Sequence, residues 1–329
     1  MKAHAILFTA PNEVALGPIE LPEPGPGEVL VESDYTAVSP GTELRCLAGK
    51  QAGLGAWPII PGYQCSGRIL QAGADSKFKK GDPVFCMGTQ KSNVNRGWGG
   101  HVSHAVVNES SVWAIPEHVD KLEAVIVKLA AICYHGVCMS KPVAHETVVV
   151  VGLGPIGQIA ARVHALSGAR VVAVDVSPER VEFTKKAGIE AIVGKPNLVD
   201  AVKALFPDGV DIVVDSTGSP AVLKQSMELC KKRPWDDVPQ QGPRLMIQGS
   251  YPDLFEVSYR AMFSAEATIL TPRDHQHRDL RAAMDLLSRG KLKLRDLISD
   301  VRTPDSAPKT YKELAENKGS LLTVAYKWK

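Results

Sequence analysis

One segment near the middle of the chain combines an apolar run with three closely spaced glycines. Residues 148–151 are all valine, and Gly152-Leu153-Gly154-Pro155-Ile156-Gly157 follows them directly. A buried strand, a glycine turn and a helix start in this order are typical of a site for the pyrophosphate of a dinucleotide. We assign Gly152, Gly154, Pro155, Ile156 and Gly157 to that site.

Each glycine of this turn has a separate physical role. Gly152 permits the tight turn, Gly154 lets the backbone approach phosphate oxygens, and Gly157 lets the helix pack closely on the strand. The helix N-terminus supplies N–H donors and a partial positive charge. The sequence therefore predicts that the backbone holds the pyrophosphate.

An acidic residue stands where the ribose of the adenosine half is expected. Asp175 ends the next apolar run, eighteen positions after Gly157. Its carboxylate would accept hydrogen bonds from ribose hydroxyls and repel a 2′-phosphate, which favours NAD over NADP. Val176 and Arg180 belong to the same adenosine segment, and the charge of Arg180 weakens this preference.

Composition excludes several classes of protein. The chain has 329 residues, of which 44% are hydrophobic and 22% charged, as in ordinary globular proteins with two domains. A net charge of +2 with scattered Lys and Arg argues against a nucleic-acid partner. No apolar run suits a membrane span and no signal peptide precedes the first strand pattern, so we expect a cytoplasmic protein. The six cysteines lack CxxC spacing and are expected to be buried thiols.

Strand and helix patterns divide the chain into two domains of an α/β protein. Residues 1–128 carry Pro- and Gly-rich turns between short alternating runs, which predicts a β-rich unit. Over residues 129–271 strand and helix patterns alternate, which predicts a doubly wound parallel sheet. Residues 272–329 end on a strand pattern, which we expect to return to the first unit. The β-rich domain is then discontinuous (1–128 and 272–329), with the dinucleotide domain (129–271) inserted.

Several short strings carry a family resemblance over the whole chain. They are Gly41-Thr42-Glu43, Pro58-Ile59-Ile60-Pro61-Gly62, Gly81-Asp82-Pro83-Val84 and Gly99-Gly100-His101. With the glycine turn, they resemble the medium-chain dehydrogenase/reductase superfamily. The resemblance implies a GroES-like catalytic domain, a Rossmann domain that binds NAD, a small-molecule substrate, and a homodimer or homotetramer. Ser39-Pro40-Gly41-Thr42-Glu43 and Pro61-Gly62-Tyr63 look most similar to the bacteriochlorophyllide hydroxyethyl dehydrogenase branch, which oxidises a secondary alcohol with NAD.

The resemblance carries over the fold and the cofactor but not the metal. Zinc members have a cysteine ligand at the position of Pro40 and a His-Glu pair at the positions of Tyr63 and Gln64, and their third ligand position falls near Lys128. None of these side chains replaces a cysteine or histidine ligand of zinc. Only Cys86 lies where a structural zinc lobe has four cysteines. We therefore predict no metal and a zinc-independent enzyme.

Without a metal, side chains must manage the proton that leaves the alcohol oxygen. Tyr63 stands at a former ligand position, and a nearby cation such as Lys128 would favour its phenolate form. We predict that Tyr63 and Lys128 form the acid/base pair, and by resemblance Thr42 begins a proton relay. Two alternatives are open: Tyr63 packs for structural reasons only, and Lys128 lies on a helix face where it snorkels or is exposed.

The substrate candidates are Gln64, His101 and Arg273. Polar side chains of this kind favour a hydroxyl-rich substrate such as a polyol, a cyclitol or a sugar derivative. Each also has a structural interpretation: Gln64 can satisfy the backbone, His101 can be a core histidine, and Arg273 can form a salt bridge.

Two further segments resemble the parts of the family that lie near the nicotinamide. Thr217-Gly218-Ser219 and Gly249-Ser250-Tyr251 each follow an apolar strand pattern. Open α/β sheets bind ligands at the carboxyl ends of their strands, so we assign both segments to the cofactor site.

Three functions remain in competition. The first is an NAD(H)-dependent oxidoreductase that interconverts a secondary alcohol and a ketone. The second is a zinc-free quinone or enoyl reductase, but such relatives use NADPH and a more Ala-Gly-rich turn, so Asp175 and Pro155 argue against it. The third is an NAD(H)-binding protein without catalytic activity.

Overall fold

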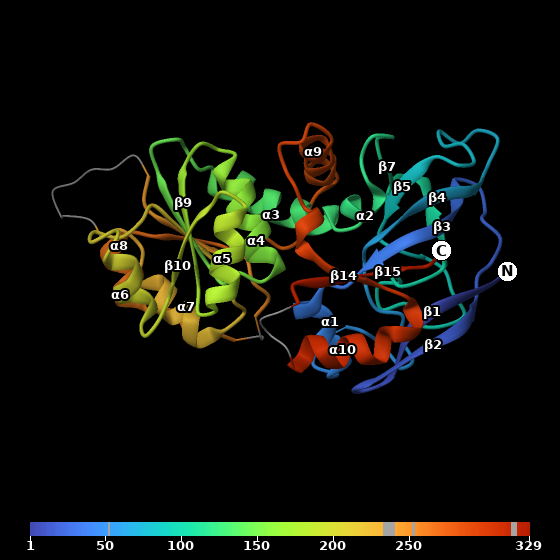
Figure 1. Cartoon of the computed structure of the whole chain (residues 1–329), viewed down its shortest axis with the longest axis horizontal. Coiled ribbons are helices and arrows are strands. Elements are labelled where there is room, and N and C mark those ends of the chain that lie inside the picture. The colour runs from blue at the N-terminus through green and yellow to red at the C-terminus, as the bar shows by residue number, and fades with distance from the viewer. Residues whose placement is uncertain (52, 233–240, 252–253, 317–320) are drawn as a thin grey trace. The chain divides into compact units, whose positions relative to one another are not determined.

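The valine run ahead of the glycine turn forms strand β8 (Thr147–Val151), which lies inside a six-stranded sheet. The computed structural model describes residues 1–51, 53–232, 241–251, 254–316 and 321–329. It divides into two units (Figure 1): unit 1 contains residues 1–128 and 284–329, and unit 2 contains residues 129–283. Within the described ranges, no helix combines the length and the apolar character that a membrane crossing needs.

The sheet of unit 2 is parallel throughout. Its order is β10-β9-β8-β11-β12-β13, the order of a doubly wound dinucleotide-binding sheet. The strands beside β8 are β9 (Arg170–Asp175), β10 (Glu190–Val193), β11 (Ile212–Asp215), β12 (Arg244–Ile247) and β13 (Thr268–Leu270). The predicted α/β class with a doubly wound parallel sheet is confirmed.

Helices cover both faces of this sheet, which is why strand β8 is apolar and buried at its last four positions, residues 148–151. Val149 and Val151 belong to a core cluster with residues of α6, α7 and α8, while α4 contacts β8 and β9. The helices that contain residues of unit 2 are α3 (Val127–Ser140), α4 (Pro155–Ala165), α5 (Pro178–Lys186), α6 (Leu198–Lys203), α7 (Pro220–Met227), α8 (Tyr259–Ala265) and α9 (His277–Ser288).

Unit 1 is built on a seven-stranded sheet and a separate hairpin of β1 and β2. The sheet order is β14-β15-β3-β4-β5-β7, and β6 also pairs with β3. The strands are β1 (Lys2–Ala10), β2 (Glu13–Glu20), β3 (Glu28–Ala37), β4 (Cys65–Ala72), β5 (Pro83–Cys86), β6 (His104–Asn108), β7 (Val112–Ala114), β14 (Ile298–Arg302) and β15 (Thr323–Lys327). The helices are α1 (Pro40–Leu47), α2 (Lys121–Ala124) and α10 (Ala307–Glu316).

The last strand of the chain returns to the N-terminal unit, as the sequence predicted. β15 pairs antiparallel with β3, so that Ala325 lies opposite Ala37. The strand on its other side is β14, which is parallel to it. Residues from the two ends of the chain therefore complete one sheet.

The second boundary between the units differs from the one expected at residues 271 and 272, because unit 1 resumes at Met284. Asp279, in the first turn of α9, is fully buried and accepts a hydrogen bond from the N–H of Gln276 at 2.7 Å. Its carboxylate also lies 2.9 Å from Nδ1 of His135 on α3. These contacts hold the start of α9 on unit 2. Apolar periodicity identifies the buried face of a helix but not the unit on which it packs.

Candidate active site

The glycine turn leaves one face open next to the start of α4. Gly152 has φ +86°, and a Cβ on Gly157 would lie only 1.7 Å from the carbonyl oxygen of Gly152. Both positions therefore require glycine. At Gly154, by contrast, a Cβ would meet nothing within 4 Å. The turn is closely packed on one side and accessible on the side of Gly154.

The N-terminus of α4 begins at this open face. Gly154 is the N-cap residue, with extended backbone angles and no side-chain cap, and Pro155 is at the first helical position. The first N–H groups of a helix have no partner within the helix. The N–H groups of Ile156 and Gly157 can therefore bind an anion such as a pyrophosphate.

Asp175, at the end of β9, is hydrogen-bonded to the same turn. Its carboxylate accepts hydrogen bonds from the N–H of Leu153 at 2.6 Å and from the N–H of Ser177 at 2.9 Å. A carboxylate has about four acceptor positions, so capacity remains for ribose hydroxyls. Nη1 of Arg180 lies 3.8 Å from Oδ2, and Val176 is exposed. The sequence did not predict that Asp175 also fixes the turn.

The loops that follow β8, β11 and β12 meet at the carboxyl ends of these strands. A Cβ on Gly152 would lie 2.7 Å from Cγ2 of Thr217, and one on Gly218 would lie 2.8 Å from the carbonyl oxygen of Ser250. A Cβ on Gly249 would lie 2.8 Å from the backbone nitrogen of Gly218. The two segments assigned to the nicotinamide half therefore pack against each other, and the first of them also packs on the glycine turn.

A buried carboxylate that the sequence analysis missed holds these loops in place. Asp215, the last residue of β11, accepts hydrogen bonds from the N–H and Oγ1 of Thr217 at 2.9 and 2.7 Å. It also accepts from Oγ of Ser226 at 2.7 Å and from the hydroxyl of Tyr251. Burial, together with this carboxylate, raises the pKa of the Tyr251 phenol, so it keeps the proton that it donates. N–H of Ser219, the N-cap residue of α7, bonds to Thr217 Oγ1 at 3.1 Å.

These residues fit a nicotinamide adenine dinucleotide. The open turn and the uncapped start of α4 suit the pyrophosphate, and Asp175 suits the adenosine ribose. The loops around Thr217 and Tyr251 follow β11 and β12, at the carboxyl ends where open α/β sheets bind their ligands. They therefore suit the nicotinamide half of the cofactor. The fit depends on the backbone at the glycine turn and at the start of α4, and on the carboxylates of Asp175 and Asp215 at the ends of β9 and β11.

Gly154→Ala should weaken NADH binding while the fold is retained. The backbone angles of Gly154 suit alanine and its Cβ meets no protein atom, but the methyl group fills the space that a phosphate approaches. We expect a Kd for NADH raised about tenfold, measured by titration calorimetry, with an unchanged Tm. Gly73→Ala, where a Cβ also meets nothing within 4 Å, is the matched control. An unchanged Kd would contradict this placement of the pyrophosphate.

In unit 1, three hydroxyl groups converge at the N-terminus of α1. Tyr63 donates a hydrogen bond to Oγ of Ser39 at 2.5 Å, and its oxygen lies 3.5 Å from Oγ1 of Thr42. The Tyr63 ring packs edge-on against Trp98, with the ring centroids 5.5 Å apart. Tyr63 is only 8% exposed, yet its hydroxyl lies among polar groups rather than in an apolar core.

Lys128 lies beside the same tyrosine. Its Nζ is 4.5 Å from the centroid of the Tyr63 ring and 3.3 Å from Sδ of Met87. At 6% exposure, Lys128 is buried, so the alternative of an exposed helix face is wrong. The structure thus brings Tyr63, Lys128 and Thr42 together, as the sequence predicted, and adds Ser39, which the sequence analysis did not propose.

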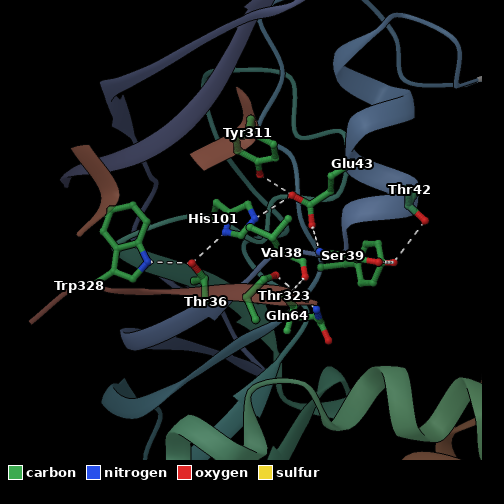
Figure 2. A network of polar contacts seen from close by, with 12 residues as sticks. Thr36, Val38, Ser39, Thr42, Glu43, Gln64, His101, Tyr311, Thr323 and Trp328 are labelled. Carbon is green, nitrogen blue, oxygen red and sulfur yellow. Dashed lines mark hydrogen bonds and ion pairs between the residues drawn. The ribbon is translucent and has the colours of Figure 1, made fainter. Parts of the chain in front are cut away.

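Figure 2 shows a network of buried polar side chains next to α1. Nδ1 of His101 lies 2.8 Å from Oγ1 of Thr36, and Nε2 lies 2.9 Å from Glu43. Thr36 also accepts a hydrogen bond from Nε1 of Trp328, so its own proton can go to Nδ1 of His101. In that tautomer the N–H of Nε2 donates a hydrogen bond to Glu43. Both ring nitrogens of this buried histidine are used, which disagrees with the expected substrate contact.

Glu43 accepts hydrogen bonds from three separate parts of the chain. Besides His101, it accepts hydrogen bonds from the N–H of Ser39 at 2.6 Å and from the hydroxyl of Tyr311 on α10. Burial and this carboxylate raise the pKa of the Tyr311 phenol, so it remains a donor. The sequence analysis missed both roles, because the partners lie far apart in the chain.

The two other substrate candidates lie in different surroundings. Gln64 is fully buried, and its Nε2 donates to the carbonyl oxygen of Ala37 at 3.3 Å. This contact supports the structural interpretation of Gln64. Arg273 is exposed and belongs to unit 2.

The side chains at the expected ligand positions do not fit zinc. Pro40 offers no donor atom, the hydroxyl of Tyr63 is bonded to Ser39, and the ammonium of Lys128 repels a cation. In the part of the chain that the structure describes, no three His, Cys, Asp or Glu side chains are grouped so as to hold a metal ion.

Two protein-family descriptions match the chain. Residues 25–117 match the alcohol dehydrogenase GroES-like domain, and residues 155–233 match the zinc-binding dehydrogenase domain. Together these matches span more than half of the chain and define an oxidoreductase of the alcohol dehydrogenase type. The chain belongs to the medium-chain dehydrogenase/reductase superfamily.

Individual relatives agree with this assignment. The chain is 25% identical to 2-desacetyl-2-hydroxyethyl bacteriochlorophyllide A dehydrogenase of Cereibacter sphaeroides over 321 residues, 94% of each chain. Its fold is similar to that of an Escherichia coli oxidoreductase/dehydrogenase of unknown specificity involved in membrane biogenesis (TM-score 0.88, 20% identity, 99% of each chain). It is also similar to 2R,3R-butanediol dehydrogenase of Bacillus subtilis (TM-score 0.85, 19% identity, 99% of each chain).

Proposed function

We propose that this oxidoreductase interconverts a secondary alcohol and a ketone with NAD(H) and without zinc. The observation that carries the proposal is the cluster of Tyr63, Ser39, Thr42 and Lys128, which puts an ionisable phenol and a cation at the ligand positions of zinc relatives. The names of two similar proteins, a hydroxyethyl dehydrogenase and a butanediol dehydrogenase, refer to secondary alcohols.

Tyr63 is the group that moves the proton in this proposal. The bound cofactor supplies the acceptor for the hydride that leaves the carbinol carbon. As that hydride leaves, the C–O bond becomes a carbonyl and the hydroxyl proton passes to the phenolate oxygen of Tyr63. In ketone reduction Tyr63 returns the same proton to the carbonyl oxygen, so Tyr63 acts as base in one direction and as acid in the other.

The charge of Lys128 and the partial positive charge of a helix N-terminus both favour the phenolate form of Tyr63. The ammonium of Lys128 lies 4.5 Å from the ring centroid, and a phenolate places more negative charge on that ring than a phenol does. The N-terminus of α1, which carries Ser39 and Thr42, adds a partial positive charge near the oxygen. Lys128 therefore acts on Tyr63 through its charge.

Tyr63→Phe should lower kcat about 10²-fold or more, because the variant keeps the ring and loses only the proton carrier. The Kd for NADH should not change, since the proposed cofactor residues lie in unit 2. Steady-state kinetics with a panel of secondary alcohols and ketones tests this, with Tyr259→Phe, an exposed tyrosine, as the matched control. Near-normal turnover of Tyr63→Phe would remove Tyr63 from the mechanism.

Zinc analysis tests the second part of the proposal. The side chains at the ligand positions do not fit zinc, so we expect clearly less than one zinc per chain by plasma mass spectrometry. Activity should also survive prolonged treatment with a chelator. Stoichiometric zinc whose removal abolishes turnover would contradict the proposal.

The preference for NAD rests on Asp175, whose buried carboxylate repels a 2′-phosphate. Arg180, with Nη1 3.8 Å from this carboxylate, is the observation that favours the alternative of an NADPH-dependent quinone or enoyl reductase. We expect NADH to bind at least about tenfold more tightly than NADPH in parallel titrations. Tighter binding of NADPH would favour the reductase. Cofactor binding without turnover on any alcohol, ketone, quinone or enone would favour a non-catalytic protein.

The finer substrate class has less support than the reaction type. A polyol, cyclitol or sugar derivative was expected from polar residues that include Gln64 and His101, and both are fully buried. The proposal therefore extends to a secondary alcohol and does not specify its further hydroxyl groups.

A further inference from the structure

We propose that Ser39 is a positioning residue whose hydroxyl hydrogen-bonds Tyr63 in both protonation states and stabilises the phenolate more than the phenol. The inference rests on the proposed function, in which Tyr63 carries the proton. The resemblance to the superfamily implies that the hydroxyl of Thr42 begins the proton relay. The geometry points to Ser39 as the direct partner of Tyr63.

The distances distinguish the two hydroxyl groups. Tyr63 donates to Oγ of Ser39 at 2.5 Å, the lower limit of O–H···O hydrogen bonds, whereas Oγ1 of Thr42 is 3.5 Å away. Ser39 and Tyr63 are both buried, so water competes little for this contact. Of the two hydroxyls, that of Ser39 is therefore the one more directly coupled to a change of charge on the Tyr63 oxygen.

The position of Ser39 in the helix gives a second, independent observation. Ser39 is the N-cap residue of α1, where a serine normally accepts a hydrogen bond from an N–H in the first turn. Its side chain makes no such bond here. The hydroxyl is used for Tyr63 instead, and a local rule broken in this way is expected at functional sites.

The buried network of Figure 2 fixes the backbone of Ser39. Its N–H donates to Glu43 at 2.6 Å, and Glu43 is held in turn by His101 and Tyr311. Because all these groups are buried, the start of α1 has little freedom to move away from Tyr63. The network therefore holds the hydroxyl of Ser39 beside Tyr63.

The hydroxyl of Ser39 changes its role as the proton moves. While Tyr63 is a phenol, Ser39 accepts its hydrogen bond, which is the arrangement that the structure contains. Once Tyr63 is a phenolate, the O–H of Ser39 turns and donates to it. When the alcohol proton reaches Tyr63, Ser39 becomes an acceptor again. Ser39 itself neither gains nor loses a proton.

Ser39→Ala tests this role. The variant removes the donor to the phenolate, so the rise of kcat/KM for alcohol oxidation should move to higher pH by about one unit. At neutral pH kcat/KM should fall about tenfold and should recover at alkaline pH, with an unchanged Kd for NADH. Ser39→Thr, which keeps a hydroxyl, should restore the wild-type profile, and Ser39→Cys replaces Ser39→Ala if the alanine variant does not fold.

Ser258→Ala is the matched control, because Ser258 is an N-cap serine whose hydroxyl does accept from an N–H, that of Ala261. It should lower Tm and leave the pH profile unchanged. An unshifted pH profile for Ser39→Ala would overturn the inference.

A spectroscopic titration separates this inference from the proposed function. The ultraviolet absorbance change of phenol ionisation, taken as the difference between wild type and Tyr63→Phe, follows Tyr63 without turnover. Ser39→Ala should move this titration to higher pH. If it does, while Tyr63→Phe retains full activity, Ser39 controls Tyr63 but the proposed acid/base role is wrong. If the titration does not move, Ser39 has no such role.

Discussion

The buried carboxylate of Glu43 is the interaction on which the arrangement of unit 1 depends. A carboxylate removed from water must receive hydrogen bonds, and here the donors come from Ser39, His101 and Tyr311. These three donors belong to the start of α1, the loop before β6 and helix α10, so their hydrogen bonds to Glu43 connect the three segments. The place of Tyr63 among the hydroxyls of α1 follows from this connection.

Unit 2 uses strand-end carboxylates in the same manner. Asp175 and Asp215 end two strands of the parallel sheet. Asp175 accepts hydrogen bonds from the loops that follow β8 and β9, and Asp215 accepts them from the loop that follows β11. The loops around the expected cofactor are thus held by side chains that bind the N–H groups of Leu153 and Thr217. The N–H groups of Ile156 and Gly157 at the start of α4 have no partner within the helix and can bind a ligand. Buried carboxylates therefore position loops and helices in both units, on helix α1 in unit 1 and at the ends of strands in unit 2.

The sequence predicted what local patterns determine. The valine run, the glycine turn and Asp175 lie within a short stretch of sequence, and their spacing matches the dimensions of one dinucleotide. The doubly wound sheet could therefore be expected from this stretch. The contacts of Glu43 and His101 could not be predicted, because their partners are up to 268 residues apart. For the same reason Lys128 could be read as exposed: a helix pattern does not reveal that an aromatic ring covers the side chain. The oligomeric state and the cytoplasmic location stay predictions.

The pairing of β15 with β3 has a consequence for synthesis of the chain. Residues 129–283 form unit 2 as one continuous stretch, and its sheet can close as soon as that stretch has left the ribosome. Unit 1 must wait, because β15 and the indole of Trp328, which bonds Thr36, come after unit 2 in the chain. During that interval the edge of β3 lacks its final neighbour, and nascent chains are exposed there to pairing with foreign strands.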